Sequence, residues 1–341
     1  DVGGSVTLES NNISELEVFT LSSSNRSGDV EIQGSENELV IQSLQLTTTG
    51  QVEIPAIDAI RGAIVVDTNE LGQSGDTMIS SLGDLLLNNI IIQSDANGSS
   101  PAGTVTIRTP GVVTFSNTQI NSNANSTGNA GSIRIDSAEL SLGSGDRISA
   151  ATSAIGDGGT ITINATESVF LGEGVQDAAP IISVEASGEG RPGNIVINTP
   201  NFVLSETAKI TATSTATATN SAEGGSIDLN ANQMDLAGTV GIFAETQGDS
   251  PGGILTLQPY QANLNTLAES QLQSSSISSD ATLTSGSGFD LTLAEGSEIS
   301  ASTTGSGNGG GLRLLAPDAI TISGPGRLAV ETSGSGQAGD V

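Results

Sequence analysis

The sequence predicts an all-β protein folded as a parallel β-helix, or β-solenoid, of about 12 coils with roughly 28 residues each and a triangular cross-section. Three observations lead to this fold class. A glycine-led pattern recurs along the chain, apolar and polar residues alternate inside each copy, and the spacing between apolar positions is preserved. Alternation with a period of two is typical of strands with one buried face, and a repeat of this length is typical of solenoids.

The clearest copy of the repeat spans residues 131–150. Ile133 and Ile135 follow a glycine, and a second and a third alternating segment begin at Leu140 and Ile148. Three strands of about three to five residues, joined by turns, would complete one coil around a triangle.

The first strand of each copy has the pattern Gly-x-Φ-x-Φ, in which Φ is an apolar residue. Clear copies begin at Gly4, Gly28, Gly50, Gly103, Gly131, Gly159, Gly193, Gly225 and Gly310. Weaker copies begin at Gly75, at Gly253 and near Asp280, and the copy at Gly339 stops within the strand. We expect one solenoid domain over residues 1–341, with shorter coils in 1–100 and regular coils in 101–341. Because neither end shows a cap, we expect a segment of a longer solenoid.

The second and third strands are separated by a constant interval. The interval of six residues that joins Leu142 to Ile148 recurs in the pairs Leu204–Ile210, Leu236–Ile242, Leu293–Ile299 and Ile322–Leu328. The equal spacing predicts one turn type at this corner. The third strand reads Φ-x-Ala in four coils, as in Ile148 and Ala150, which suits a narrow interior. We expect insertions only at the third corner, between the third strand and the next glycine.

A polar residue follows the first strand in four successive coils: Asp136, Asn164, Asn198 and Asn230. Stacked coils would place these side chains in a ladder, and Asn and Asp tolerate the left-handed conformation that sharp corners need. The alternative is a set of ordinary turn residues without a ladder.

The composition argues against several classes of partner. The chain has 38 acidic and 9 basic residues, a formal net charge of −29, and neither Cys nor His. This charge disfavours nucleic acid and anionic membrane surfaces. No apolar run reaches the length of about 18 residues that a membrane span needs. We therefore expect no nucleic-acid partner and no direct membrane insertion, and we expect stability to come from stacked coils.

Catalysis on a β-helix needs clustered acidic residues beside Arg, Lys or His. Lysine occurs once, His is absent, and the arginines are scattered along the sequence. Asp228 and Asp235, on neighbouring strands of one coil, are the example of a carboxylate pair, but such pairs are expected by chance in so acidic a chain. We therefore predict no catalytic, cofactor-binding or metal-binding residues and no enzyme activity.

Binding without catalysis leaves other candidates. Phe170 and Phe243 are the outward aromatic residues that could form a sugar platform, with Val203 in the slot after Phe170, although partial burial under neighbouring loops is the simpler interpretation. The outward slot of the first strand is not an unbroken threonine column, which argues against ice binding; it contains Thr106, Arg134, Thr162, Val196, Asp228 and Thr256. Weak Ca²⁺ binding by acidic turns is the one metal interaction that stays open. The motifs at 156–159 (GDGG) and 248–250 (GDS) are interpreted as plain turns.

The repeat resembles that of filamentous-haemagglutinin-like exoproteins, and especially the large surface proteins of this type in cyanobacteria. The resemblance rests on residues 128–135 (GNAGSIRI), 140–142 (LSL), 148–150 (ISA), 294–301 (AEGSEISA) and 307–310 (GNGG). It covers residues 100–341 well and 1–100 loosely.

This resemblance implies a right-handed β-helix, export by two-partner secretion and adhesive roles at the cell surface. The secretion domain of the family is not recognisable in this sequence. A repeat identifies architecture better than activity. We therefore expect an extracellular structural or adhesive protein that acts as a stalk, coat or filament. Its expected partners are copies of the solenoid, packed end to end, and surface glycans. The alternative is a carbohydrate-binding or carbohydrate-cleaving β-helix.

Overall fold

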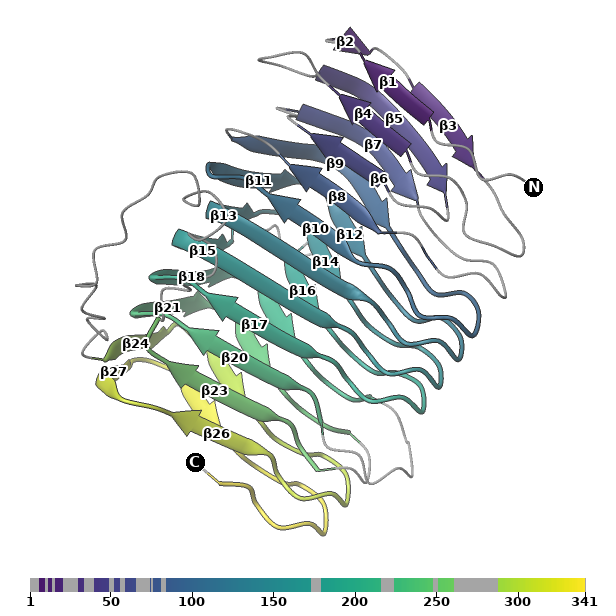
Figure 1. Cartoon of the computed structure of the whole chain (residues 1–341). Coiled ribbons are helices and arrows are strands. Elements are labelled where there is room, and N and C mark those ends of the chain that lie inside the picture. Colours follow the sequence, from purple (N-terminus) through teal and green to yellow (C-terminus); the bar gives the residue numbers. More distant parts are fainter. Residues whose placement is uncertain are drawn as a thin grey trace, which may run out of the picture.

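The computed structural model of the chain is a β-solenoid whose strands all belong to one parallel sheet (Figure 1). It describes residues 6–9, 12–13, 16–20, 30–33, 40–48, 52–55, 59–65, 74, 76–80, 84–172, 179–215, 224–247, 251–260 and 288–340; before residue 74, and at residue 80, only the backbone is described. Every regular element in these residues is a strand. No helix that could cross a membrane occurs in this part of the chain. The predicted all-β parallel solenoid is confirmed.

The strands form three columns, in each of which a strand pairs in parallel with the strands of the coils before and after it. The first column contains β1 (Val6–Glu9), β4 (Val30–Gln33), β6 (Val52–Pro55), β8 (Thr77–Ser80), β10 (Val105–Arg108), the first halves of β13 (Ser132–Leu142) and β15 (Thr160–Leu171), β17 (Asn194–Asn198), β20 (Ser226–Asn230), β23 (Ile254–Gln258) and β26 (Gly311–Leu314).

The second column lies after the first corner of each coil. It contains β2 (Asn12–Ile13), the first parts of β5 (Val40–Thr48), β7 (Ala59–Val65) and β9 (Leu85–Gln93), then β11 (Val112–Ser116), the second halves of β13 and β15, β18 (Asn201–Glu206), β21 (Gln233–Gly238), β24 (Phe289–Ala294) and β27 (Pro317–Ile322).

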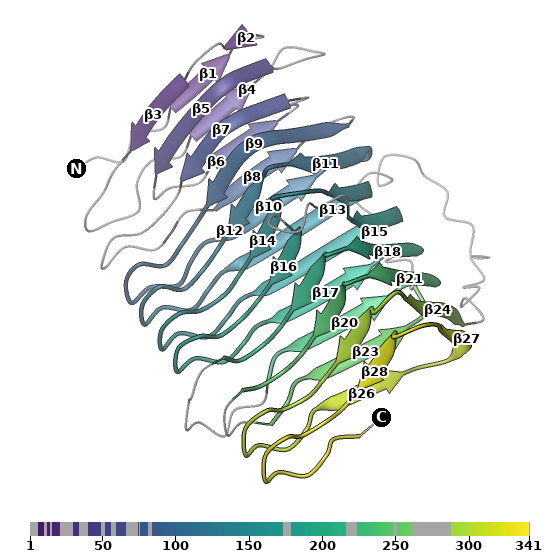
Figure 2. The same ribbon diagram turned by 180° about the vertical axis from the view of Figure 1, so that it is seen from behind.

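The third column completes each coil. It contains β3 (Leu16–Thr20), the last parts of β5, β7 and β9, then β12 (Gln119–Asn121), β14 (Arg147–Ser149), β16 (Ile181–Ser183), β19 (Lys209–Thr211), β22 (Gly241–Phe243), β25 (Glu298–Ser300) and β28 (Arg327–Ala329). The N-terminal and C-terminal coils lie at opposite ends of the stack, and the third-corner connections gather along one edge (Figure 2).

Several coils have fewer separate strands than the three that the sequence predicts. β13 and β15 run through the first corner without interruption, and their pairing shifts register between Ser137 and Glu139. β9 similarly runs through the second corner, where Asn89 has a positive φ of 55°. A bulge or one left-handed residue bends these strands without breaking the pairing.

The interior of the solenoid contains stacked aliphatic rows. Ile133, Ile161, Ile195 and Ile227 follow one another in register along the first column and are all buried. The intervening residues point outward because side chains alternate along a strand. Residues 1–100 contribute strands to the same columns, as the sequence predicts.

From Gly131 onward, the glycine that opens each copy of the repeat lies directly against the opening glycine of the preceding coil. A Cβ built on Gly131 would lie 1.9 Å from the carbonyl oxygen of Gly103, and one built on Gly159 would lie 1.7 Å from that of Gly131. The same close contact recurs at Gly193, with 1.9 Å to the oxygen of Gly159. The coils approach so closely at this corner that only glycine fits.

The alanine of the third strand belongs to the same narrow contact. Gly159 N donates a hydrogen bond to Ala150 O over 2.8 Å, and Gly253 N donates to Ala244 O over 2.9 Å. Both alanines are buried. The two ends of the third-corner loop therefore lie in contact through small residues. This contact confirms the prediction that the alanine of the Φ-x-Ala pattern fits a narrow interior.

Two predictions about the corners are wrong. The constant interval of six residues does not correspond to one turn type: Gly145, three residues after Leu142, has a φ of 83°, whereas Glu206, two residues after Leu204, has a φ of 63°. The chain can reverse at either position because the interval fixes only its end points.

Insertions are also not confined to the third corner. Residues 173–178 fall between β15 and β16, at the second corner, and residues 261–287 fall between β23 and β24, at the first. The weak repeat copy near Asp280 lies outside the described residues. Among the described strands, β23 pairs directly with β26 in the first column.

Candidate functional site

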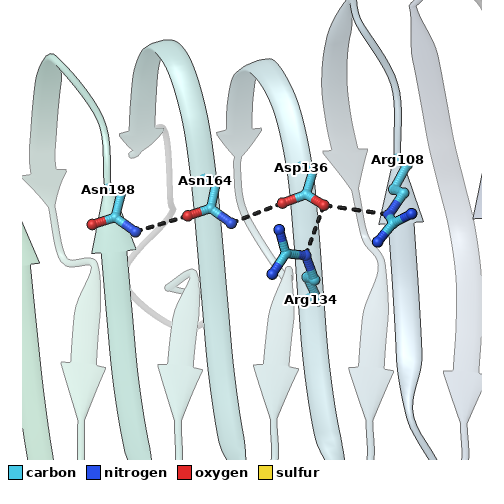
Figure 3. A network of polar contacts seen from close by, with 5 residues as sticks. All are labelled: Arg108, Arg134, Asp136, Asn164 and Asn198. Atoms are coloured by element: carbon cyan, nitrogen blue, oxygen red, sulfur yellow. Dashed lines mark hydrogen bonds and ion pairs between the residues drawn. The ribbon is translucent and has the colours of Figure 1, made fainter. Parts of the chain in front are cut away.

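A row of polar side chains runs along the first corner, where the first strand column ends (Figure 3). Asn164 Nδ2 donates to Asp136 Oδ1 over 2.8 Å, and Asn198 Nδ2 donates to Asn164 Oδ1 over 2.7 Å. Asn230 Nδ2 donates to Asn198 Oδ1, and Gln258 Nε2 donates to Asn230 Oδ1 over 2.7 Å. The predicted ladder is confirmed, and Gln258 extends it by one coil.

The reason that the sequence suggested for these residues is wrong, however. Neither Asp136 nor the three ladder asparagines is among the described residues with a positive φ. The side chains serve to satisfy one another, because Asn164, Asn198 and Asn230 are nearly buried. Each buried amide then has a partner in the coil above and in the coil below.

Two arginines meet the ladder at its first member. Arg134 Nε lies 2.7 Å from Asp136 Oδ2, and Arg108 Nε of the preceding coil lies 3.4 Å from the same oxygen. Their side chains are 39% and 49% exposed, so solvent screens both pairs and each contributes about 1 kcal/mol at most. Arginines that appear scattered in the sequence thus converge here. The cluster places one carboxylate between two guanidinium groups, and the Arg108–Asp136 pair links two neighbouring coils.

The carboxylate pair suggested by the sequence is divided between two columns. Asp228 lies on β20, in line with Val196 and Thr256. Asp235 lies on β21, where its carboxylate accepts a hydrogen bond from Gln233 Nε2 over 3.0 Å. The outward slot of the first column is aligned as predicted, and arginine, valine and aspartate interrupt its threonines.

The two outward aromatic residues do not form a common surface. Phe170 lies on the second half of β15 beside Val203, and Phe243 lies on β22 in the third column. Each is half-buried, and each ring covers a glycine two residues away along the chain. A Cβ on Gly172 would lie 2.6 Å from Phe170 Cζ, and one on Gly241 would lie 2.0 Å from Phe243 Cζ. The contact with these glycines accounts for part of the burial of each ring.

A second polar cluster lies on the third column. Ser300 Oγ donates to Glu245 Oε1 over 2.5 Å, and burial raises the pKa of Glu245, which this hydrogen bond opposes. Arg327 Nε lies 3.1 Å from Glu298 Oε1, and Arg327 Nη2 lies 3.3 Å from Glu331 Oε2. The cluster offers carboxylates, a hydroxyl and a guanidinium on one face.

Asp146 is a deeply buried carboxylate that the sequence did not single out. It is 1% exposed, and its two oxygens accept hydrogen bonds from Thr118 N over 2.7 Å and from Gly143 N over 2.6 Å. Burial raises its pKa to about 6, and the two backbone hydrogen bonds oppose the shift. Asp146 thereby fixes the second corner of its coil against the preceding one.

The predicted turn motif at 156–159 is a turn between coils. Asp157 N donates to Asn129 Oδ1, and Asp157 Oδ1 accepts from Arg191 N, both over 3.0 Å. Residues 248–250 lie outside the described residues. In the part of the chain that the structure describes, no group of three or more acidic residues could hold a metal ion.

Comparisons with protein-family models, with curated proteins and with solved structures found no match to this chain. The resemblance to filamentous-haemagglutinin-like exoproteins therefore stays a prediction.

Sequence reasoning missed the Arg108–Asp136 pair, although a signal was present: the two residues are 28 apart, which is one repeat period. It also missed the Glu245–Ser300 contact, whose members are 55 residues apart because an insertion separates them.

Proposed function

We propose that the chain is an extracellular structural and adhesive protein that acts as a stalk, coat or filament and has no catalytic activity. The single observation that carries this proposal is the continuous bonding of each coil to the next, through strand pairing and the ladder from Asp136 to Gln258. A rod bonded along its whole length resists bending and local unfolding. The Arg108–Asp136 ion pair joins two adjacent coils as well.

The finer features of the proposal follow from the repeat and from the family that it resembles. The coils wind in a right-handed sense with a triangular cross-section, and about 12 of them build the rod. The protein reaches the cell surface by two-partner secretion. Copies of the rod associate end to end through unpaired strand edges, acidic turns bind Ca²⁺ weakly, and nucleic acid and membrane insertion play no part. Three strand columns and a net charge of −29 support these points.

Electron microscopy of the purified chain in negative stain tests the mechanical part of the proposal. A spacing of about 4.8 Å per coil predicts monomeric rods of roughly 55–60 Å, and end-to-end association predicts filaments in multiples of that length. Globular particles would contradict the rod. Incubation with a panel of plant, algal and bacterial polysaccharides tests the absence of catalysis, because release of reducing or unsaturated ends would show an enzyme.

A further inference from the structure

The outer face of the third column around Phe243 carries groups that the stability of the rod does not require. We propose that the outer face of β16, β19, β22, β25 and β28 binds a neutral, extended oligosaccharide, with Phe243 as the platform for one pyranose ring. This inference deepens the adhesive part of the proposed function and rests on it, because it names the surface and the chemical class of the ligand.

Phe243 has the position that such a platform needs. It is half-buried on the outer side of β22, and its ring tip covers Gly241, where a Cβ would lie 2.0 Å from Cζ and 2.1 Å from Cε2. Glycine thus lets the ring lie along the strand. A partly exposed aromatic ring can pack against the apolar face of a sugar ring, and its attachment to a rigid sheet limits the entropy lost on binding.

Charged groups flank the ring in the adjacent coils. Strand pairing aligns Lys209, Gly241, Glu298 and Arg327 in one row across β19, β22, β25 and β28. This row offers hydrogen-bond donors from Lys209 and Arg327 and acceptors from Glu298, which together suit sugar hydroxyl groups. With Glu245 and Glu331 nearby, the acidic groups of this face slightly outnumber the two basic ones, so the face disfavours a polyanion.

Two buried hydroxyl groups provide an independent indication of a missing partner. Thr211 pairs with Phe243 in the next coil and with Ser183 in the preceding one, so the three residues share a row on the outer side. Ser183 Oγ and Thr211 Oγ1 have no hydrogen-bond partner among the described residues, and both side chains are more than nine-tenths buried. Unsatisfied buried hydroxyls are costly, and a ligand hydroxyl that reached them would pair with them.

The spacing of the strands sets the shape of the ligand. Neighbouring strands are about 4.8 Å apart, so Lys209 and Arg327, three strands apart, span about 14 Å along the rod. A straight row of this length suits several sugar rings in an extended chain. A strongly curved chain would contact the row at one point only.

Titration calorimetry with three hexasaccharides tests the proposal on the full chain. We expect saturable binding of cellohexaose, which is extended, and at least tenfold weaker binding of maltohexaose, which is curved, and of a heparin hexasaccharide, which is anionic. Phe243→Ala should weaken cellohexaose binding about tenfold. The matched control is Phe170→Ala, which removes the other half-buried ring that covers a glycine but lies on a different column, and it should leave binding unchanged.

Lys209→Ala provides a second test if Phe243→Ala fails to fold, because Lys209 is exposed. It should weaken cellohexaose binding severalfold. Absence of binding to all three sugars, equal effects of Phe243→Ala and Phe170→Ala, or preferred binding of the heparin fragment would each overturn the inference. Rod length in micrographs distinguishes this failure from failure of the proposed function, because a rod that binds no sugar keeps its mechanical role.

Discussion

The close contact between the opening glycines makes Gly131→Ala the sharpest test of how the coils stack. The added methyl group would lie 1.9 Å from Gly103 O and 2.3 Å from Ser122 Oγ. Ser122 can rotate away, but the carbonyl oxygen belongs to the backbone of the adjacent coil. The two coils must therefore separate locally by more than 1 Å to reach an ordinary contact of about 3.5 Å.

The expected loss in the free energy of unfolding of Gly131→Ala is the sum of three contributions. Overpacking of a tight contact costs about 1–3 kcal/mol. Displacing the backbone of Gly131 also disturbs the hydrogen bonds from Gly131 N to Ser122 O and from Thr160 N to Gly131 O, each worth about 0.5–1.5 kcal/mol. Alanine also makes the unfolded chain less flexible than glycine does, which stabilises the folded state by about 0.4–1 kcal/mol. This gain applies here because Gly131 does not have a positive φ, so alanine can adopt its backbone conformation. We expect the free energy of unfolding to fall by about 3 kcal/mol.

Gly143→Ala is the matched control, since it makes the same chemical change within the same coil. Its added Cβ would lie 3.9 Å from Asp146 Oδ2 and 4.0 Å from Gly172 O, which are ordinary contacts. This variant should be neutral or slightly more stable than the parent. Urea unfolding followed by circular dichroism gives both free energies. Equal stability of the two variants would refute the argument that close coil contact selects the opening glycine.

Three further predictions concern the ladder, the buried carboxylate and the core. Asn198→Ala should lower the free energy of unfolding by about 1–3 kcal/mol, because it removes one ladder hydrogen bond from each of the nearly buried residues Asn164 and Asn230; a loss below 0.5 kcal/mol would contradict this. The raised pKa of Asp146, about 6 against 3.8 when unfolded, means that the folded state binds the extra proton, so stability should fall as pH rises from about 4 to 6. Allowing for solvent screening, the loss is about 1–2 kcal/mol, and it should be absent from the pH profile of Asp146→Asn. Ile195→Ala should cost about 2–5 kcal/mol in a thermal or urea melt, whereas Val196→Ala on the outer face should cost less than 1 kcal/mol.

The alternation of side chains is the part of the fold that sequence can predict most directly. Ile161 and Ile163 are buried and the intervening Thr162 points outward, because a strand turns successive side chains to opposite faces. Asn164 and Asn198 stack for the related reason that parallel coils in register superpose equivalent positions. Both inferences need only the repeat and the geometry of a strand.

The corners and the outer faces could not be predicted in the same way. Gly145 and Glu206 reverse the chain at different points within equal intervals, since the interval does not specify backbone torsion angles. Phe243 lies over Gly241, a contact that depends on a side-chain rotamer. Glu245 and Ser300 are 55 residues apart, because an insertion separates their coils. Their hydrogen bond could therefore not be predicted from the repeat period.

The polar ladder has a direction, and Asp136 determines it. A carboxylate can only accept hydrogen bonds, so Asn164 must present its amino group to Asp136 and its oxygen to Asn198, and each later amide repeats this orientation. The amide dipoles therefore add along the rod axis, with their positive ends toward the carboxylate. The arrangement is a side-chain counterpart of the helix macrodipole, in which an anion lies at the positive end. One aspartate thus gives this part of the rod an electrical polarity, so that its two axial directions are no longer equivalent.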